Sequence, residues 1–415
     1  MLIKKLRLKN FRQYIGEQVI EFSTEREKNV TVLIGVIYMI YFDNAATSRP
    51  KPEAVYKAFE YYVREIGTSP GRGSYSLAIQ ASRMLYQSRK TVAGFFGIED
   101  PSCVVFTKNS TEAINLYFNG FLRAGDHVII SPYEHNAVLR PLQALKNKGI
   151  IDYSVLPEEM LYSDGNKHLK DFVRENTRLL ALTLASNLTG QIIFRTPLSK
   201  EAHKLGLTVF VDASQGAGKK LINMSRDEID VLAFTGHKDL LGLPGVGGLV
   251  SQNELHITPL IQGGTGIHGE SYVNPEAYPD SYESGTLNMP AIWALKEALK
   301  YVEDNLEKNR ERENRLVQTA VEKLKRIEGV IVYRPDLNRV STFCFNIKGV
   351  PSSEVVQILD NHGICVRGGI HCAIKAHETL GTVETGAVRV SLNAFNTLQE
   401  IDEFVRVIEG IKPCI

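Results

Sequence analysis

A lysine at the end of an apolar segment is the first residue of this sequence that could do chemistry. Residues 230–236, DVLAFTG, have the composition of a buried strand and run directly into His237 and Lys238. Desolvation at the end of a buried strand lowers the pKa of a lysine toward about 7–8, and the free amine can form an imine. For this segment taken alone, an exposed lysine without a function is the alternative.

A carboxylate ends a second apolar segment. Residues 208–212, TVFVD, finish at Asp212, and Gln215 follows three residues later. Enzymes that use pyridoxal 5′-phosphate (PLP) place an acid beside the pyridine nitrogen, because the protonated ring is an electron sink. We therefore interpret Asp212 as the partner of the ring nitrogen and Gln215 as a contact of its phenolic oxygen. Taken alone, Asp212 is equally compatible with a helix cap.

A predicted helix start offers groups that suit the phosphate. Residues 104–116, VVFTKNSTEAINL, change from a strand-like to a helical pattern at Asn109, Ser110 and Thr111, and Glu112 is placed as in a capping box. Free backbone N–H groups at a helix start, together with hydroxyl groups, suit a phosphate dianion. A plain capping box is the alternative for this segment alone.

The elements around these residues predict an α/β fold. Between residues 41 and 289, short apolar runs alternate with amphipathic helical stretches, which is the pattern of a mostly parallel sheet. After Pro290 a long charged helical stretch leads into further strands and a closing helix. We expect a large domain over residues 39–290 and a smaller α+β domain over residues 291–415. The later strands are expected near residues 330–333, 341–347, 364–367 and 387–392.

The overall composition does not favour binding to nucleic acid or membrane. The 415 residues are 43% hydrophobic and carry a net charge of +1, as in a globular protein of two or three domains. Five scattered cysteines without C-x-x-C spacing argue against a disulfide framework and against a structural zinc site. We expect a cytoplasmic protein that has no metal site and no membrane span.

Residues 1–38 follow neither pattern. They alternate like a β-hairpin with a basic face, end in a strand-like stretch at residues 30–35, and resemble the opening of RecF/SMC-type ATPases, including the ATPase of DNA sulfur modification. No G-x-x-x-x-G-K-[ST] loop occurs in the chain, and GAGKK at residues 216–220 is only an imitation, so ATP hydrolysis is not expected. Two interpretations stay open for this extension: a fusion remnant, or a start chosen too early, since Met39 directly precedes the next pattern.

Eight motifs together resemble one family. They are YFDNAATSRPKPEAV, TKNSTEAINL, SPYEHNAVLRPL, ASNLTG, VDASQ, FTGHK, ESGTLN and RGGIHCA. In this order, from about Ile40 to the C-terminus, the chain resembles the class V aminotransferases, which are fold type I PLP enzymes, and most closely their cysteine-desulfurase branch. The resemblance implies a seven-stranded, mostly parallel sheet in the large domain and packing of residues 39–60 against the small domain.

The resemblance also implies roles for residues at the matching positions. Lys238 would be the Schiff-base lysine, His135 would stack on the cofactor ring and relay protons, and Cys372 would be the nucleophile. Arg389, assisted by Asn187, would clamp the α-carboxylate of the substrate. The cofactor would be held by Ser110, Thr111, His135, Asn187, Asp212, Gln215, Thr235, His237, Lys238 and, from a second subunit, Thr286.

Cys372 differs from the other cysteines in its surroundings. It lies in a glycine-rich loop, whereas Cys103, Cys344 and Cys365 lie on apolar runs that are typical of buried, inert thiols. A thiol at its ordinary pKa is only a few per cent thiolate at neutral pH, so an activating cation or proton acceptor is needed. The candidates are His371, Arg367 and the substrate amine.

The loop of Cys372 departs from the more familiar family pattern. Ile370 stands where His is frequent, and the stretch from Cys372 to Arg389 is short. This spacing is similar to that of type II desulfurases, whose cysteine usually waits for a dedicated sulfur acceptor.

The resemblance predicts a PLP-dependent cysteine desulfurase that converts L-cysteine to L-alanine and passes the sulfur, held as a persulfide, to an acceptor protein. A selenocysteine lyase, a cysteine-sulfinate lyase or another Cβ lyase is the alternative with the same cofactor. The N-terminal resemblance leaves a role in DNA sulfur modification open, although direct nucleic-acid binding is not expected. A homodimer is also implied, in which Thr286 crosses the interface.

Overall fold

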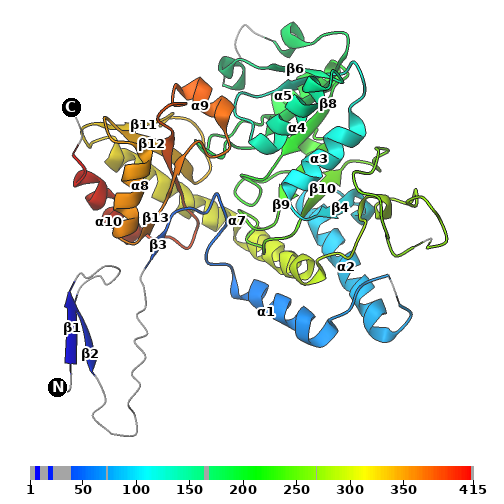
Figure 1. The fold of residues 1–415 in the computed structure, drawn as a ribbon, viewed down its shortest axis with the longest axis horizontal. Coiled ribbons are helices and arrows are strands. Elements are labelled where there is room, and N and C mark those ends of the chain that lie inside the picture. Colours follow the sequence, from blue (N-terminus) through cyan, green and yellow to red (C-terminus); the bar gives the residue numbers. More distant parts are fainter. Residues whose placement is uncertain are drawn as a thin grey trace.

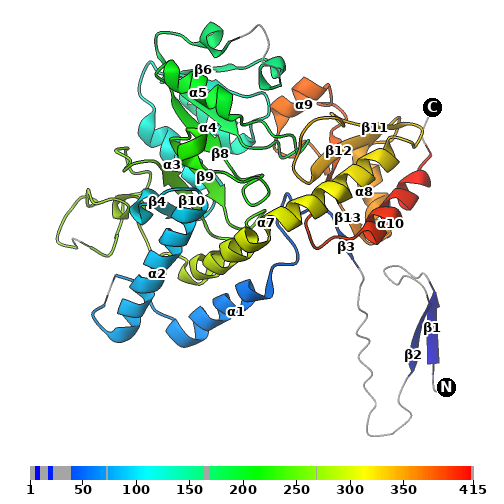
Figure 2. The same cartoon turned by 180° about the vertical axis from the view of Figure 1, so that it is seen from behind.

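The computed structural model of the protein describes residues 5–9, 17–21, 39–71, 73–162, 168–267 and 269–412. From residue 39 on, these residues form a large sheet covered by helices, a smaller sheet, and one long helix that runs along both (Figures 1 and 2). In these ranges no helix combines the length and the apolar character that a bilayer span requires.

The predicted N-terminal hairpin is confirmed. β1 (Lys5–Lys9) pairs antiparallel with β2 (Glu17–Glu21), with Lys5 opposite Glu21 and Lys9 opposite Glu17. The expected strand at residues 30–35 lies outside the described residues.

The large sheet has seven strands in the order β4-β10-β9-β8-β7-β5-β6. Neighbours from β9 to β6 run parallel, whereas β10 runs antiparallel to both β9 and β4. The predicted mostly parallel, seven-stranded sheet is therefore confirmed. The strands are β4 (Val104–Thr107), β5 (His127–Ile130), β6 (Asp152–Val155), β7 (Thr177–Thr183), β8 (Thr208–Asp212), β9 (Val231–Thr235) and β10 (Gly247–Ser251).

Both faces of this sheet carry a hydrophobic core. Val104 and Phe106 belong to one cluster of buried side chains and Val105, between them, belongs to another, because successive strand residues point to opposite faces. The apolar strands therefore need helices on both sides. The helices of this region are α1 (Glu53–Tyr61), α2 (Ser76–Phe95), α3 (Ser110–Phe121), α4 (Asn136–Asn147), α5 (Thr196–Lys204) and α6 (Met224–Asp227), with short helices η1 (Tyr62–Ile66), η2 (Pro101–Cys103), η3 (Glu158–Leu161), η4 (Leu169–Phe172) and η5 (Asp280–Tyr282).

The smaller sheet has the strand order β11-β12-β15-β14, and β13 pairs in parallel with β3 instead. The single strand expected over residues 364–367 is therefore wrong: it is divided into β13 and β14, because the two halves pair with different partners. The elements are β3 (Ile40–Tyr41), β11 (Val330–Val332), β12 (Thr342–Ile347), β13 (Ile364–Cys365), β14 (Arg367–Gly369), β15 (Ala387–Ser391), α8 (Ser352–Asn361), α9 (Ile374–Leu380) and α10 (Leu398–Glu409).

Helix α7 (Met289–Leu324) belongs to both regions (Figure 2). Its first half buries Leu295 and Leu299 in a core of the large sheet, and its second half buries Leu316 and Leu324 in the core of the small sheet. One continuous helix therefore joins the two cores.

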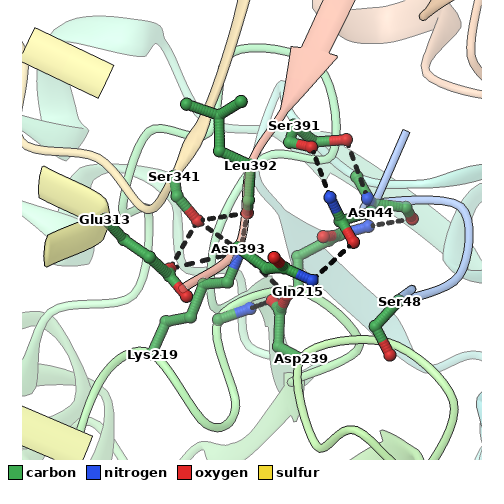
Figure 3. A network of polar contacts seen from close by, with 12 residues as sticks. Asn44, Ser48, Gln215, Lys219, Asp239, Glu313, Ser341, Ser391, Leu392 and Asn393 are labelled. Carbon is green, nitrogen blue, oxygen red and sulfur yellow. Dashed lines mark hydrogen bonds and ion pairs between the residues drawn. The ribbon is translucent and has the colours of Figure 1, made fainter. Parts of the chain in front are cut away.

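A buried charge cluster lies beside α7, where the two regions meet (Figure 3). The ammonium of Lys219 is 3.0 Å from the carboxylate of Asp239 and 3.6 Å from that of Glu313 in α7. It also donates to the hydroxyl of Ser341, just before β12, and to the carbonyl of Leu392, just after β15. Because Asp239 directly follows Lys238, this single cation connects the end of β9 to the small sheet.

Replacing Lys219 by methionine should destabilise the protein by about 3–5 kcal/mol, because two buried carboxylates lose their cation. Urea unfolding followed by circular dichroism measures the loss. Glu313→Gln is the matched control, since it keeps the Lys219–Asp239 pair, and it should cost clearly less. Equal losses in the two variants would contradict a central role for the lysine.

Candidate active site

A cavity of about 220 Å³ lies at the edge of the large sheet where β7, β8 and β9 end. The structure brings every predicted cofactor residue except Thr286 to its wall. Asn109, from the predicted helix start, also lies there, together with two residues that the sequence did not single out: Thr183 and Ser214. Thr183 ends β7 opposite Asp212. Its position at the carboxyl edge of a parallel sheet is the feature that could have identified it from the sequence. The wall consists of Asn109, Ser110, Thr111, His135, Thr183, Asn187, Asp212, Ser214, Gln215, Thr235, His237 and Lys238.

Lys238 follows β9 after two residues and lies against this cavity. Burial lowers the pKa of its ammonium; the carboxylate of Asp212 opposes that shift, and the guanidinium of Arg389 adds to it. The lowered pKa makes the neutral amine, which is the form that acts as a nucleophile or a base, easier to reach than in an exposed lysine.

The side chain of Asp212 is held in a fixed orientation. Its side chain is buried, and its Oδ1 accepts hydrogen bonds from the backbone N–H of Ser214, at 2.9 Å, and from the hydroxyl of the same serine. Gln215 is oriented from another direction, because its Nε2 donates to the carbonyl of Ala45 at 2.9 Å. Both side chains thus reach the cavity wall in fixed orientations.

His135 caps α4 and is neutral at physiological pH. Burial lowers its pKa to about 4, and the nearby charge of Lys238 contributes. Its Nδ1 accepts a hydrogen bond from the N–H of Ala137 at 3.0 Å, so the ring proton lies on Nε2. The ring therefore presents an apolar face and one defined donor.

The start of α3 closes another side of the cavity. Asn109 caps the helix by accepting from the N–H of Glu112 at 3.0 Å, whereas the Glu112 carboxylate accepts from the N–H of Lys108 rather than from that of Asn109. Only one of the two hydrogen bonds of the expected capping box is therefore formed, because the second comes from the residue before the cap. Ser110 and Thr111 open the helix at the cavity wall, where first-turn N–H groups point at a ligand.

Two polar atoms near this helix start lack partners. Within the described ranges, Thr235 Oγ1 and His237 Nδ1 are buried without a hydrogen bond. Burial also lowers the pKa of His237 to about 4, with Lys238 and Lys51 contributing. Buried polar atoms are rarely left unpaired, so these groups fit a ligand that offers several oxygens. The lysine, the fixed carboxylate and this donor set together fit PLP.

Arg389 lies on β15, between β12 and β14, and is only 2% exposed. Arg389 is therefore not a solvated residue at the edge of the sheet. Its Nη1 donates to the carbonyl of Asn187 at 3.0 Å, and its Nη2 lies 2.6 Å from Oδ1 of Asp43. The sequence motif YFDNAAT contains Asp43, but no role was predicted for it.

Cys372 is exposed in the turn between β14 and α9, and its backbone is held in place. The carbonyl of Cys372 accepts from the N–H of Asn136, beside His135, at 2.8 Å, and the carbonyl of His371 accepts from Asn187 Nδ2 at 2.7 Å. His371 and Cys372 both adopt positive φ, of 54° and 56°. Such a conformation is uncommon for residues other than glycine and fits a strongly constrained turn.

His371 does not supply the cation that was considered for thiol activation. Burial lowers its pKa to about 3, and its Nε2 lies 3.1 Å from the carbonyl of Arg367. The neutral ring can serve only as a proton acceptor or donor. Arg367 and the substrate amine stay as candidate cations.

Two of the other cysteines are buried, as predicted. Cys103 and Cys344 are buried, whereas Cys365 is half-buried, because β13 belongs to a two-stranded sheet and not to the core of a larger one. Cys414 lies outside the described residues.

Thr286 lies on a neighbouring cavity of about 550 Å³. Asn109 and His237 line both cavities, so the two sites adjoin at the predicted phosphate position.

Comparison with known proteins now places the chain in a family. The aminotransferase class-V profile matches residues 40–404. The chain belongs to this family. Two class-V relatives are a probable cysteine desulfurase of Methanothermobacter thermautotrophicus, 33% identical over 381 residues, and one of Pyrococcus abyssi, 33% identical over 387 residues. Each alignment covers 90% of this chain and 94% of the relative.

Solved structures agree with the class-V assignment. The apo cysteine desulfurase of Thermococcus onnurineus superposes with a TM-score of 0.82 at 33% identity, and the cysteine desulfurase CsdA of Escherichia coli with 0.79 at 28%. Both cover 90% of this chain and 94% of the solved chain. The predicted fold type I architecture and the cysteine-desulfurase branch are therefore confirmed.

Glu134, which precedes His135 in this class-V site, is buried with an unusual proton affinity. Its Oε1 accepts from the hydroxyl of Ser131 at 2.5 Å and from the N–H of Thr183 at 2.8 Å, whereas its Oε2 has no partner among the described residues. Burial raises its pKa to about 8, and repulsion from Asp212 adds to this shift. The folded protein therefore keeps this carboxyl protonated at neutral pH.

Stability should consequently fall as the pH rises through the window between the two pKa values of Glu134. The unfolded chain releases the proton near an ordinary pKa of about 4.3, and the folded protein releases it near 8. Glu134→Gln should match the wild type at about pH 4 and be more stable near pH 9, by up to roughly 1.4 kcal/mol per unit of pKa difference. Urea unfolding across this range measures the effect, and an unchanged pH slope in the variant would refute it.

Proposed function

We propose that the protein is a PLP-dependent cysteine desulfurase that converts L-cysteine to L-alanine and keeps the sulfur on Cys372 as a persulfide. One observation carries the proposal. The cavity that combines Lys238, Asp212 and unpaired phosphate-type donors is tied through Asn187 both to Arg389 and to the loop of Cys372. The names of the relatives support the same activity.

The wall of the cavity provides a partner for each part of the cofactor. Lys238 would bind PLP covalently, Asp212 would pair with the pyridine nitrogen, Gln215 would contact the phenolic oxygen, and His135 would stack on the ring. When bound, PLP supplies an electron sink that labilises the bonds around the substrate Cα. The phosphate would be held by Ser110, Thr111, Thr235 and His237, with Thr286 of a second subunit.

Different residues of the chain would bind the substrate, accept its proton and attack its sulfur. Arg389 and Asn187 bind the α-carboxylate and so fix the orientation of the Cα bonds. Lys238, whose pKa is lowered by burial, accepts the Cα proton. The thiolate of Cys372 attacks the substrate sulfur: an S–S bond forms, the C–S bond breaks, and its electron pair stays with the organic product. Protonation of that product gives L-alanine.

The exposed position of Cys372 supports transfer of the sulfur to an acceptor protein. Its thiol lies at the surface while its backbone is fixed by the start of α4, so a second thiol can approach it. A nucleophilic cysteine must also stay reduced, which supports a cytoplasmic location.

Cys372→Ser should retain PLP but lose formation of persulfide and alanine from L-cysteine by roughly 100-fold or more, because a hydroxyl cannot take up the sulfur. Alanine, sulfide and protein persulfide would be measured on the yellow holoenzyme, with and without reductant. Cys365→Ser is the matched control. Wild-type alanine formation by Cys372→Ser would exclude the desulfurase assignment, and activity retained on selenocysteine alone would indicate a lyase.

We also propose a homodimer, because exposed apolar side chains are concentrated in α1, η1, α2 and the segments beside them. α1 and α2 both pack on α7, and α2 also contacts η1, which continues α1 (Figures 1 and 2). Thr286 lies on the cavity that adjoins the phosphate site, so a second copy seated here would complete that site. Clustered exposed apolar side chains mark an interaction surface. They are Tyr56, Phe59, Tyr61, Val63, Tyr75, Leu77, Ile79 and Tyr86, with Tyr272 and Val273 in the loop before Thr286.

Leu77→Asp combined with Ile79→Asp should convert the dimer to a monomer that retains less PLP, because charges in an apolar interface are costly. Light scattering and the PLP content after gel filtration measure both effects. Ile331→Asp, an exposed apolar residue on β11, is the matched control. A monomeric wild-type enzyme with full PLP content and activity would overturn the proposal.

A further inference from the structure

Asp43 lies where the chain passes from the small sheet to the cofactor cavity. It follows β3 and forms a bridge with Ser391, two residues after Arg389 on β15. We propose that Asp43 is a positioning residue that orients the guanidinium of Arg389, so that its Nε edge is presented to the α-carboxylate of the substrate. The identity of that ligand rests on the proposed function.

The hydrogen bonds of Arg389 leave one edge of its guanidinium unpaired. Nη2 is bound to Asp43 at 2.6 Å and Nη1 to the carbonyl of Asn187 at 3.0 Å. Nε is buried and has no hydrogen-bond partner in the part of the chain that the structure describes. Two anchors fix the plane of the group, and an unpaired buried donor favours an acceptor. A carboxylate oxygen is the acceptor that matches a guanidinium best.

Asp43 also offsets an unfavourable concentration of positive charge. Arg367 on β14 lies directly opposite Arg389 on β15 in the antiparallel ladder, and like charges opposite each other are destabilising. Burial and Arg367 both lower the pKa of Arg389, whereas the carboxylate of Asp43 raises it. Asp43 thus keeps a cation at this buried position before a substrate arrives.

The segment after Asp43 is fixed at both ends (Figure 3). Asn44 donates from Nδ2 to the carbonyl of Ser391 at 2.9 Å, and the N–H of Ala45 donates to the hydroxyl of Ser391 at 2.8 Å. The carbonyl of Ala45 accepts from Gln215, which lines the cofactor cavity. Asp43 therefore belongs to a short segment that connects the strand of Arg389 to the cofactor cavity.

A competing interpretation predicts the opposite effect of removing Asp43 on ligand binding. If Asp43 stood in the place of the substrate carboxylate, its removal would free Arg389 and strengthen binding. The geometry favours the positioning role, because Asp43 engages Nη2 and leaves Nε available, so both carboxylates can bind the same guanidinium.

The test compares a ligand that has the carboxylate with one that lacks it. The dissociation constants of L-alanine and L-alaninamide would be measured on the holoenzyme through the absorption change of the cofactor. Asp43→Asn should weaken L-alanine binding by about tenfold or more and leave L-alaninamide within about twofold. Asp43→Glu, which restores the charge, should recover part of the affinity. Asp336→Asn, an exposed carboxylate of the small domain, is the matched control.

Unchanged or tighter L-alanine binding in Asp43→Asn would overturn the inference, and so would an equal loss for both ligands, which would mean a structural role only. If Asp43→Asn does not retain PLP, the comparison is made on Asp43→Glu. In that variant the displaced carboxylate should weaken L-alanine binding by a smaller factor than that expected for Asp43→Asn and leave L-alaninamide within about twofold, and an equal loss for both ligands would overturn the inference. A wild-type enzyme that binds L-alanine in this way but forms no persulfide from L-cysteine would refute the desulfurase function and leave the role of Asp43 intact.

Discussion

The burial of cations at the junction of two sheets is the constraint on which this structure depends. Lys238, Lys219 and Arg389 are each withdrawn from water. Burial lowers the pKa of Lys238, whereas a cation at Lys219 or Arg389 is tolerated only with a carboxylate and further hydrogen bonds around it. Each carboxylate comes from another segment or from a strand end. Asp212 ends β8 and faces Lys238, Asp239 pairs with Lys219, and Asp43 pairs with Arg389. The packing of the two regions adds further partners to two of these groups: Glu313 and Ser341 to Lys219, and the carbonyl of Asn187 to Arg389.

Much of the fold was predictable, because it depends on local pattern. Apolar runs alternating with amphipathic stretches specify a parallel sheet, and residues at strand ends such as Asp212 and Thr235 meet at one edge of it. The division between β13 and β14 was not predictable, since it depends on β3 as a distant partner. The shifted capping contact of Glu112 depends on the geometry of a single turn.

The contacts that the sequence missed join residues far apart in the chain. Asp43 and Arg389 are 346 positions apart, and Lys219 and Leu392 are 173 apart, so no local window contains both partners. Lys219 attracted notice only as part of an imperfect phosphate loop, whereas the structure gives it four protein partners and a buried position. Family resemblance named the residues of the cavity, but it did not indicate the orientation of their side chains.

The continuity of α7 has a mechanical consequence. At 1.5 Å per residue, its 36 residues form a rod about 54 Å long whose two halves belong to different hydrophobic cores. Neither core can melt without exposing one half of the same helix, so the two regions are expected to lose their structure in one cooperative transition. A hinge motion between them is restricted for the same reason, because it would have to bend this rod or slide a core along it.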